Sequence, residues 1–411
     1  MVSSFQQNLE KYAELAIKVG VNIKQGQTLV INATLDGAEF VRLATKKAYE
    51  AGASNVIVNW SDDTITRLKY QMADEEVFKE YPQYRAKETT ELAEKGAAFL
   101  HVLASSPDLL KGVSPIRIAN NQKSSGQALK QYRQYVQSDK IAWSIVAVPS
   151  QAWADMVFAD AKEEERVALL WDAIFKATRI DQENPVAAWQ AHNENLHTKV
   201  DYLNKKKYKK LHYRAPGTDL MVELPKKNLW CGAGSVSEAG TEFMANMPTE
   251  EVFSMPLKTG VNGYVSSTKP LSYGGNIIDR FKLTFEGGRI VEATAEVGEE
   301  ILKGIIETDE GSHYLGEVAL VPHQSPISES NVLFYNTLFD ENASNHFAIG
   351  SAYAFNLEGG KTMSREELNA NGANESITHV DFMVGSAEMD IDGITEDGTA
   401  EPIFRNGNWA F

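Results

Sequence analysis

The chain has 411 residues, of which 43% are hydrophobic and 23% are charged, proportions that are typical of a folded globular protein. One compact core seldom holds so many residues, so we expect two domains. The 56 acidic and 40 basic side chains give a net charge of −16. That charge repels nucleic acids and anionic membrane surfaces, and it argues against both as partners.

Two further features concern the compartment of the protein. Cys231 is the single cysteine, which excludes an internal disulfide and a metal cluster held by several thiolates. No apolar run approaches the roughly 20 residues that a membrane-spanning helix needs. Residues 1–7 also lack the basic and apolar blocks of a signal peptide. We therefore expect a cytoplasmic protein.

The first half of the sequence alternates between helical and β-type patterns. In chain order we predict a helix at 5–19, a strand at 28–32, a helix at 38–51, and strands at 55–60, 98–103 and 143–148. Strand, helix and strand at this spacing predict a parallel sheet covered by helices. No glycine-rich nucleotide motif follows any of these strands, so a bound dinucleotide or nucleoside triphosphate is not indicated.

The pattern changes after a basic stretch near residues 203–210. Beyond it, runs that alternate with period two are separated by glycine-rich turns, and they lie at 212–214, 220–224, 281–285 and 289–293. This predicts a largely antiparallel sheet, with helices at 299–306 and 345–356. The predicted fold class is therefore α/β, with an N-terminal α/β domain of parallel strands at 1–208 and a C-terminal α+β domain at 209–411.

A histidine and an aspartate alternate in a strand predicted at 378–384. His379 and Asp381 project from the same face because successive side chains alternate. An imidazole nitrogen beside a carboxylate is a ligand pair for a first-row metal. A buried histidine bonded to its neighbouring aspartate, or two solvent-facing polar residues, would give the same pattern. The motif alone therefore leaves both interpretations open.

A second histidine, His346, also lies in an acid-rich stretch. Three candidate N-caps precede the helix predicted at 345–356: Asp340, Asn342 and Ser344. On such a helix His346 and Tyr353 are two turns apart along one face, so a metal ligand and a phenol could address the same site. The alternative is an interior histidine and a core tyrosine, and for Tyr353 alone this alternative is preferred.

Glutamates in apolar surroundings complete the set of candidate ligands. Glu250 and Glu251 start a predicted strand, on which they must point to opposite faces. Glu317 leads into the apolar run 315–321. A charge at the head of a buried strand is costly unless it is paired or binds a metal. Structural ion pairing is at least as good an interpretation for either segment alone.

Taken together, glutamates, an aspartate and two histidines without thiols suit Zn²⁺, Co²⁺ or Mn²⁺ in a hydrolytic site. Two such ions about 3.5–4 Å apart that share a carboxylate can activate water and polarise a peptide carbonyl. The HExxH and GxSxG motifs are absent, and Cys231 has no evident histidine partner. A zincin site is therefore excluded, and serine or cysteine nucleophiles are weakly supported.

Four of these stretches resemble a known family. They are 246–253, 315–321, 339–343 and 374–381, and the tail at 389–393 is also similar. In this order they resemble the thermophilic-type metalloaminopeptidases, the family of aminopeptidase T and aminopeptidase S. The likeness covers nearly the whole chain and is motif-specific after about residue 210.

The resemblance implies a dinuclear metal site and two divalent metal ions per chain (Zn, Co or Mg/Mn). The implied metal ligands are Glu251, Glu317, His346, His379 and Asp381, with Glu317 as the bridge. Tyr353 corresponds to a family tyrosine that is either a ligand or a transition-state donor. Glu250 could replace Glu251 as a ligand, and the glutamate of this pair that does not bind metal, Glu250 if Glu251 is the ligand, is a candidate for the general base. Glu341 is a second candidate for the base or an outer ligand.

The expected reaction is removal of N-terminal residues from peptides with broad residue preference, by a protein that the resemblance implies to be a homodimer. Two other classes of function fit part of the same pattern. One is a metal-dependent amidase or deacylase acting on non-peptide substrates, and the other is a non-catalytic α/β binding protein whose acidic residues merely pair.

Overall fold

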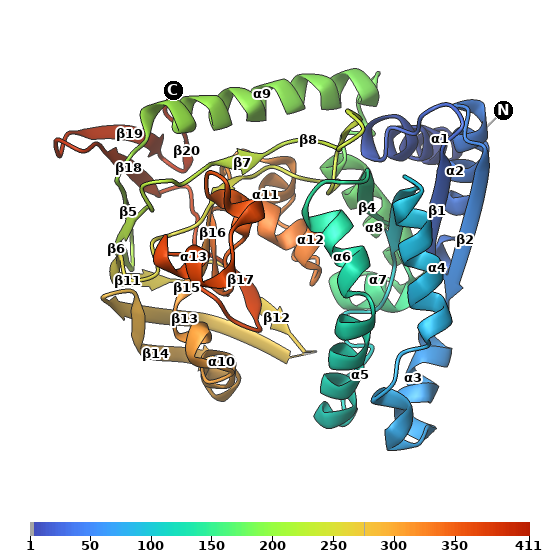
Figure 1. The fold of residues 1–411 in the computed structure, drawn as a ribbon, viewed down its shortest axis with the longest axis horizontal. Coiled ribbons are helices and arrows are strands. Elements are labelled where there is room, and N and C mark those ends of the chain that lie inside the picture. The colour runs from blue at the N-terminus through green and yellow to red at the C-terminus, as the bar shows by residue number, and fades with distance from the viewer. Residues whose placement is uncertain (1–3, 275) are drawn as a thin grey trace. The chain divides into compact units, whose positions relative to one another are not determined.

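The computed structural model describes residues 4–274 and 276–411, and the chain divides into two compact units (Figure 1). Unit 1 comprises Met1–Ala191 and Gly234–Pro248, and unit 2 comprises His192–Ala233 and Thr249–Phe411. Helix α9 (Pro185–Lys206) runs from one unit into the other. The segment 234–248 returns to unit 1 before the rest of the chain completes unit 2.

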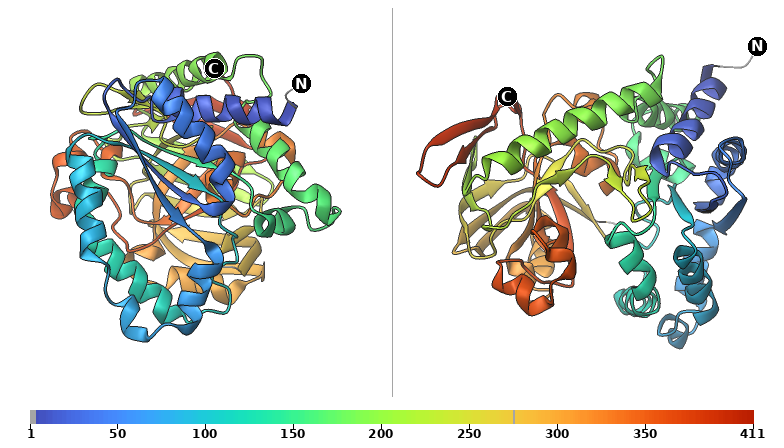
Figure 2. Two further views of the ribbon diagram at one scale, coloured as in Figure 1. Left: turned by 90° about the vertical axis from the view of Figure 1, so that its right-hand side faces the viewer. Right: turned by 45° about the horizontal axis from the view of Figure 1, so that its top comes forward.

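Unit 1 is built on a parallel sheet with the strand order β2-β1-β3-β4, whose strands lie side by side in the left view of Figure 2. The strands are β1 (Thr28–Thr34), β2 (Asn55–Ser61), β3 (Ala98–Leu103) and β4 (Trp143–Ala147). The helices are α1 (Ser4–Leu15), α2 (Ala38–Glu50), α3 (Asp63–Met72), α4 (Gln83–Glu94), α5 (Pro115–Ala128), α6 (Lys130–Gln137), α7 (Gln151–Val157) and α8 (Glu163–Ala177). The short strands β8 (Ser235–Val236) and β9 (Glu242–Phe243) pair with each other.

The alternation seen in the sequence explains this sheet. Val30 and Phe99 are directly opposed on β1 and β3, and both belong to a buried cluster with Ala93 of α4. Tyr132 of α6 packs against the same cluster. The predicted parallel α/β arrangement of the first half is confirmed, and β3 has the bounds that were predicted.

Unit 2 contains a large antiparallel sheet with the order β12-β13-β11-β6-β5-β18-β19-β20, in which β14 also pairs with β13. Its strands are β5 (Lys210–Ala215), β6 (Thr218–Glu223), β11 (Val261–Ser266), β12 (Leu271–Tyr273), β13 (Asn276–Glu286), β14 (Arg289–Val297), β18 (Asp390–Ile394), β19 (Ala400–Arg405) and β20 (Asn408–Trp409). The helices of the unit after α9 are α10 (Glu299–Ile306), α11 (Pro326–Ser330), α12 (Thr337–Asp340) and α13 (Arg365–Ala370). The predicted antiparallel arrangement of the strands and the predicted helix at 299–306 are confirmed.

A second antiparallel sheet of unit 2 has the order β17-β16-β15-β10-β7, and we call it the site sheet. Its strands are β7 (Cys231–Gly232), β10 (Val252–Ser254), β15 (Leu315–Leu320), β16 (His346–Gly350) and β17 (His379–Met383). One apolar core joins the two sheets, since Tyr213 of β5 packs against Phe347 of β16 with ring centroids 5.0 Å apart. Phe281 of β13 packs in the same way against Phe382 of β17.

The helix predicted at 345–356 is wrong. His346–Gly350 is the buried strand β16, and a short 3-10 turn follows at Ala354–Asn356. A strand buried on both faces is apolar at every position, so its sequence cannot be told from a buried helix by periodicity. Gly350 ends this strand, and glycine is required there because its φ is +111° and a Cβ would lie 2.2 Å from the carbonyl oxygen of Thr378.

None of the helices among the described residues is both long enough and apolar enough to cross a membrane.

Candidate metal centre

The site sheet arranges the candidate ligands through its strand register. Directly opposed residues on neighbouring strands share one face of a sheet. On β15 and β16, Glu317 is opposite Ala348, and Ala319 is opposite His346. Because side chains alternate along a strand, Glu317 and His346 project from the same face.

Strand β17 extends this face by two more ligands. Asp381 is opposite Ala348 and His379 is opposite Gly350, so both side chains lie on the face of His346. The prediction that His379 and Asp381 project together is confirmed.

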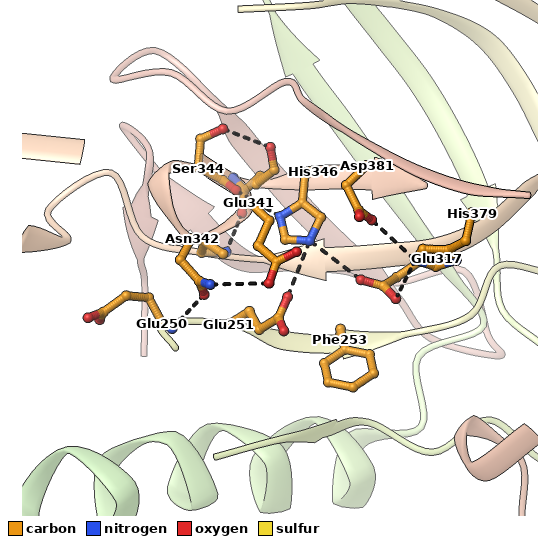
Figure 3. A network of polar contacts seen from close by, with 12 residues as sticks. Glu250, Glu251, Phe253, Glu317, Glu341, Asn342, Ser344, His346, His379 and Asp381 are labelled. Atoms are coloured by element: carbon orange, nitrogen blue, oxygen red, sulfur yellow. Dashed lines mark hydrogen bonds and ion pairs between the residues drawn. The ribbon is translucent and has the colours of Figure 1, made fainter. Parts of the chain in front are cut away.

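The remaining candidate, Glu251, directly precedes strand β10. Phe253 is opposite Ala319, which places it on the ligand face. Glu251 lies two residues before Phe253, and its side chain is directed toward His346 (Figure 3). The opposite face of the site sheet is apolar and buried, and its residues include Val252, Val318, Leu320, Phe347, Ile349, Val380 and Phe382. A rigid core thus supports the ligand face.

The distances within this ligand cluster fall into two groups that share Glu317. In the first, His346 Nε2 lies 3.2 Å from Glu251 Oε2 and 3.4 Å from Glu317 Oε1. In the second, His379 Nε2 lies 3.6 Å from Glu317 Oε2 and 3.2 Å from Asp381 Oδ1. The ligand atoms of each group all lie within 4.8 Å of one another. The two carboxylate oxygens of Glu317 therefore face different histidines.

Backbone carbonyls orient both imidazole rings. His346 Nδ1 lies 3.1 Å from the carbonyl oxygen of Ser344, and His379 Nδ1 lies 2.8 Å from that of Ser351. A carbonyl oxygen only accepts hydrogen bonds, so each Nδ1 carries the proton and donates it. Each Nε2 is then the nitrogen that can bind a metal, which is the usual role of such backbone contacts at metal sites.

Comparison with known proteins agrees with this geometry. The sequence model of the thermophilic metalloprotease (M29) family matches residues 5–409. The chain is 64% identical to aminopeptidase AmpS of Bacillus subtilis (strain 168), with 100% of both chains covered. It is 54% identical to aminopeptidase 2 of Geobacillus stearothermophilus, covering 100% of this chain and 99% of the other. The solved structure of wild-type AmpT from Thermus thermophilus superposes with a TM-score of 0.94 at 43% identity, covering 99% of this chain and 100% of that one.

This chain belongs to the thermophilic metalloprotease (M29) family. It is accordingly a metal-dependent aminopeptidase, and the resemblance drawn from its motifs is confirmed. The α/β and antiparallel architecture also matches the solved relative.

The donor set of this M29 metalloprotease fits divalent cations. Three buried atoms of the cluster make no hydrogen bond of standard geometry within the described part of the chain, although each has an ion-pair contact at 3.2 Å: Glu251 Oε2, His346 Nε2 and Asp381 Oδ1. Incompletely satisfied polar atoms are costly in a low-dielectric interior. Carboxylate oxygens and imidazole nitrogens, without sulfur, are the donors that Zn²⁺, Co²⁺ and Mn²⁺ accept. Bound cations would satisfy these atoms and balance the clustered negative charge.

The pKa values of the two histidines also show how strongly the cluster attracts positive charge. Burial lowers the pKa of His379, but the hydrogen bond and charge of Asp381 outweigh it and raise that pKa to about 9. Burial also lowers the pKa of His346, while Glu251 and Glu317 raise it well above the usual value. The metal-free cluster therefore holds protons on its imidazoles, and cations must displace them.

The two acidic candidates outside the ligand cluster lie differently. Glu341, in the 3-10 turn Glu341–Ala343, lies beside His346 in Figure 3. It also lines a cavity together with Asp381 and Asp340. Burial and then the charge of Glu251 raise the pKa of Glu341 well above its usual value. Glu250 instead points away from the cluster (Figure 3), with its Oε2 atom 3.5 Å from Nε2 of His192.

Tyr353 approaches the cluster from the loop after β16 rather than from a helix. Its ring packs against His379 with centroids 4.9 Å apart and is stacked on Phe355 at 5.1 Å. It keeps 36% of its surface exposed. Burial, followed by the charges of Glu317 and Asp381, raises the pKa of Tyr353 well above its usual value, so the phenol stays protonated.

Two buried residues next to the ligand cluster were not among the predicted site residues. Asn342 was considered only as a helix cap, but it is fully buried and its Oδ1 accepts a hydrogen bond from the amide of Glu250. His192 lies in α9, 57 residues before the carbonyl that it contacts. Only the tertiary fold brings these residues to the glutamate doublet.

Proposed function

We propose that this chain cleaves the first peptide bond of peptides with a dinuclear metal centre. The single observation that carries the proposal is the division of the ligand atoms into two groups that share Glu317. Glu251, Glu317 and His346 would hold one divalent ion, and Glu317, His379 and Asp381 would hold the other. A pair of ions that share a carboxylate activates water and polarises the carbonyl of the scissile bond.

Within this proposal, the directions of the Glu250 and Glu251 side chains decide which of the two is the metal ligand. Glu251 is directed at His346, whereas Glu250 is directed at His192, so Glu251 is the ligand. Glu251→Gln is then expected to lose one ion per chain, while Glu250→Gln keeps both. Metal analysis after gel filtration measures the difference. Equal metal content in the two variants would contradict the assignment.

The general base is Glu341 in this proposal. It lies beside the ligand cluster and, together with Asp381, lines an adjacent cavity of about 30 Å³ that has room for water. The positive charge of bound cations would oppose the burial and the Glu251 charge that raise the pKa of Glu341, and its carboxylate could then take a proton from the attacking water and pass it to the leaving amine. Glu250, by contrast, is directed away from this space. Tyr353, which remains protonated, donates a hydrogen bond to the oxyanion as the carbonyl is attacked.

Recognition of a free N-terminus follows from the same charges. An α-ammonium group is attracted by buried carboxylates, and an acetylated peptide lacks this charge. The cavity beside Glu341 has a volume of about 30 Å³, which has room for water but not for a substrate side chain, so broad residue preference rests on the family resemblance. The family resemblance further predicts a homodimer, which sedimentation velocity tests directly.

Hydrolysis of leucine p-nitroanilide before and after chelation tests the proposed function. Activity is expected to disappear in the metal-stripped protein and to return with Co²⁺ or Zn²⁺, while acetyl-leucine p-nitroanilide stays uncleaved. Full activity without metal would overturn the dinuclear mechanism. Equal cleavage of the blocked substrate would instead favour a general amidase.

A further inference from the structure

One peptide group next to the ligand cluster is held at both of its polar atoms. The carbonyl oxygen of Thr249 lies 2.8 Å from His192 Nε2, and the amide nitrogen of Glu250 donates a 2.7 Å hydrogen bond to Asn342 Oδ1. These two atoms belong to the same planar peptide unit. Because a carbonyl oxygen only accepts, Nε2 of His192 carries the proton of the first bond.

These contacts lie in the interior of unit 2. Asn342 is fully buried, and Thr249 and Glu250 keep only 6% and 3% of their surface exposed. The side chain of His192 is 9% exposed. Water cannot easily replace either hydrogen bond at such sites, so the loss of one partner leaves a buried polar group unsatisfied. The orientation of this peptide plane is therefore strongly determined.

The plane decides which glutamate reaches the metal centre. A fixed peptide between Thr249 and Glu250 fixes the directions in which the following side chains leave the backbone. Glu250 is then turned toward His192, and Glu251 toward His346, as Figure 3 shows for the two glutamates. Since successive side chains in extended chain point to opposite sides, a flip of this plane would disturb both.

Asn342 also reaches the candidate base. Its Nδ2 atom donates to the carbonyl oxygen of Leu338 at 3.1 Å and lies 3.4 Å from Glu341 Oε1. The same side chain thus contacts the backbone of the glutamate doublet and the carboxylate of Glu341.

We propose that His192 and Asn342 are positioning residues that clamp the Thr249–Glu250 peptide and so present Glu251 to the metal centre. This inference rests on the proposed function, because it gives a role only if Glu251 is a ligand. Neither residue touches the substrate in this scheme. Both act through the backbone that carries the ligand.

The test compares His192→Leu and Asn342→Ala with a matched control. Asn204→Ala is a suitable control. Asn204 lies on α9, as His192 does, and its side chain also holds backbone groups far away in the sequence: it accepts a hydrogen bond from the amide of Trp230 and donates one to the carbonyl oxygen of Trp230. Loss of an outer contact at a metal site typically costs about 10- to 100-fold in activity or metal affinity. We expect kcat on leucine p-nitroanilide to fall by that factor in both clamp variants, with KM changed by less than about threefold.

A spectroscopic readout separates positioning from simple loss of stability. The visible absorption spectrum of the Co²⁺-loaded enzyme reports the ligand geometry, and it is expected to change in both clamp variants but not in Asn204→Ala. His192→Gln can place an amide N–H where Nε2 lies, so it should recover most of the lost kcat. The shorter side chain of His192→Asn cannot reach and should not. This Gln and Asn pair makes the same comparison if His192→Leu fails to fold.

The possible outcomes are distinct. Unchanged kcat and an unchanged Co²⁺ spectrum in the clamp variants would overturn the clamp, as would losses no larger than those of Asn204→Ala. A wild-type enzyme that binds no stoichiometric Co²⁺ would overturn the proposed function and the clamp together. If the wild type binds two ions but the clamp variants keep its kcat and its Co²⁺ spectrum, only the clamp is overturned.

Discussion

Metal binding to this enzyme should compete with protons over an unusually high pH range. The pKa of His379 is raised to about 9, because the hydrogen bond and charge of Asp381 outweigh the effect of burial. An unperturbed histidine titrates near 6.5, so an ordinary site would be free of this competition at neutral pH. Here the imidazolium of His379 must lose its proton before Nε2 can bind a cation.

The size of the effect follows from that pKa. A pH of 7 is about two units below the pKa of His379. Removing the proton from His379 at this pH therefore costs roughly 2.7 kcal/mol, at 1.36 kcal/mol per unit. The apparent affinity for the ion held by His379 is therefore expected to be about 100-fold weaker at pH 7 than its limiting value. It should rise about tenfold per pH unit up to pH 9 and then level off.

Chelator-buffered titrations with Zn²⁺ between pH 6.5 and 8.5 measure this slope. Calorimetry in buffers of different ionisation enthalpy counts the protons released, and about one per ion is expected at pH 7 from His379 alone. The His212→Gln variant is a matched control, since His212 pairs with Asp219 in the large sheet at 2.8 Å. An affinity that is flat from pH 7 to 8.5, without proton release, would refute this reasoning.

The stability of the metal-stripped protein should fall as the pH rises, whereas its affinity for metal should increase. A histidine whose folded pKa is raised stabilises the fold fully below its unfolded pKa of about 6.5, and this contribution is lost as the pH rises through about 9. Thermal unfolding of the apoenzyme is thus expected to move to lower temperature between pH 6.5 and 9. Metal-loaded protein should not follow this trend, because the bound cation replaces the proton.

Three substitutions test the ligand set and two structural features of unit 2. His379→Ala should abolish turnover while circular dichroism shows an intact fold, and near-wild-type rates would remove it from the ligand set. Asp309 accepts bonds from Ser312 and from the amide of Ile377, and these bonds outweigh its burial and lower its pKa to about 2. Asp309→Ala should therefore cost about 1–2 kcal/mol in urea unfolding at pH 7, and the difference should shrink as the pH falls from about 4 toward 2; an equal loss at all pH values would contradict this. Gly350→Ala should cost at least about 2 kcal/mol, because φ is +111° and its Cβ would meet the neighbouring strand, and an unchanged unfolding midpoint would count against that steric argument.

Much of the architecture could be read from local patterns. The run at 98–103 and the helix at 299–306 were predicted with the bounds that the structure shows. His379 and Asp381 were placed on one face from the alternation of side chains, and their 3.2 Å contact agrees. These features depend only on residues a few positions apart, which is why the sequence contains them.

His346 shows where this reasoning fails. Its segment reads equally well as a buried helix, and only pairing with β15 and β17 makes it a strand. The seven-residue spacing to Tyr353 was therefore interpreted on the wrong geometry, although both side chains do reach the cluster. Similarly, alternation predicted that Glu250 and Glu251 diverge, but it could not say which one faces the histidines.

Residue types and short-range periodicity determined the class of chemistry, the strands and helices, and the pairing of His379 with Asp381, because these follow from composition and from backbone geometry within one element. The tertiary structure decided that the ligand-bearing strands meet around Glu317 and that Glu251, rather than Glu250, faces His346. Both depend on contacts between residues far apart in the chain, such as His192 with Thr249 and Asn342 with Glu250. Such contacts form only when a shared core fixes the strands against each other, and no local pattern encodes that arrangement.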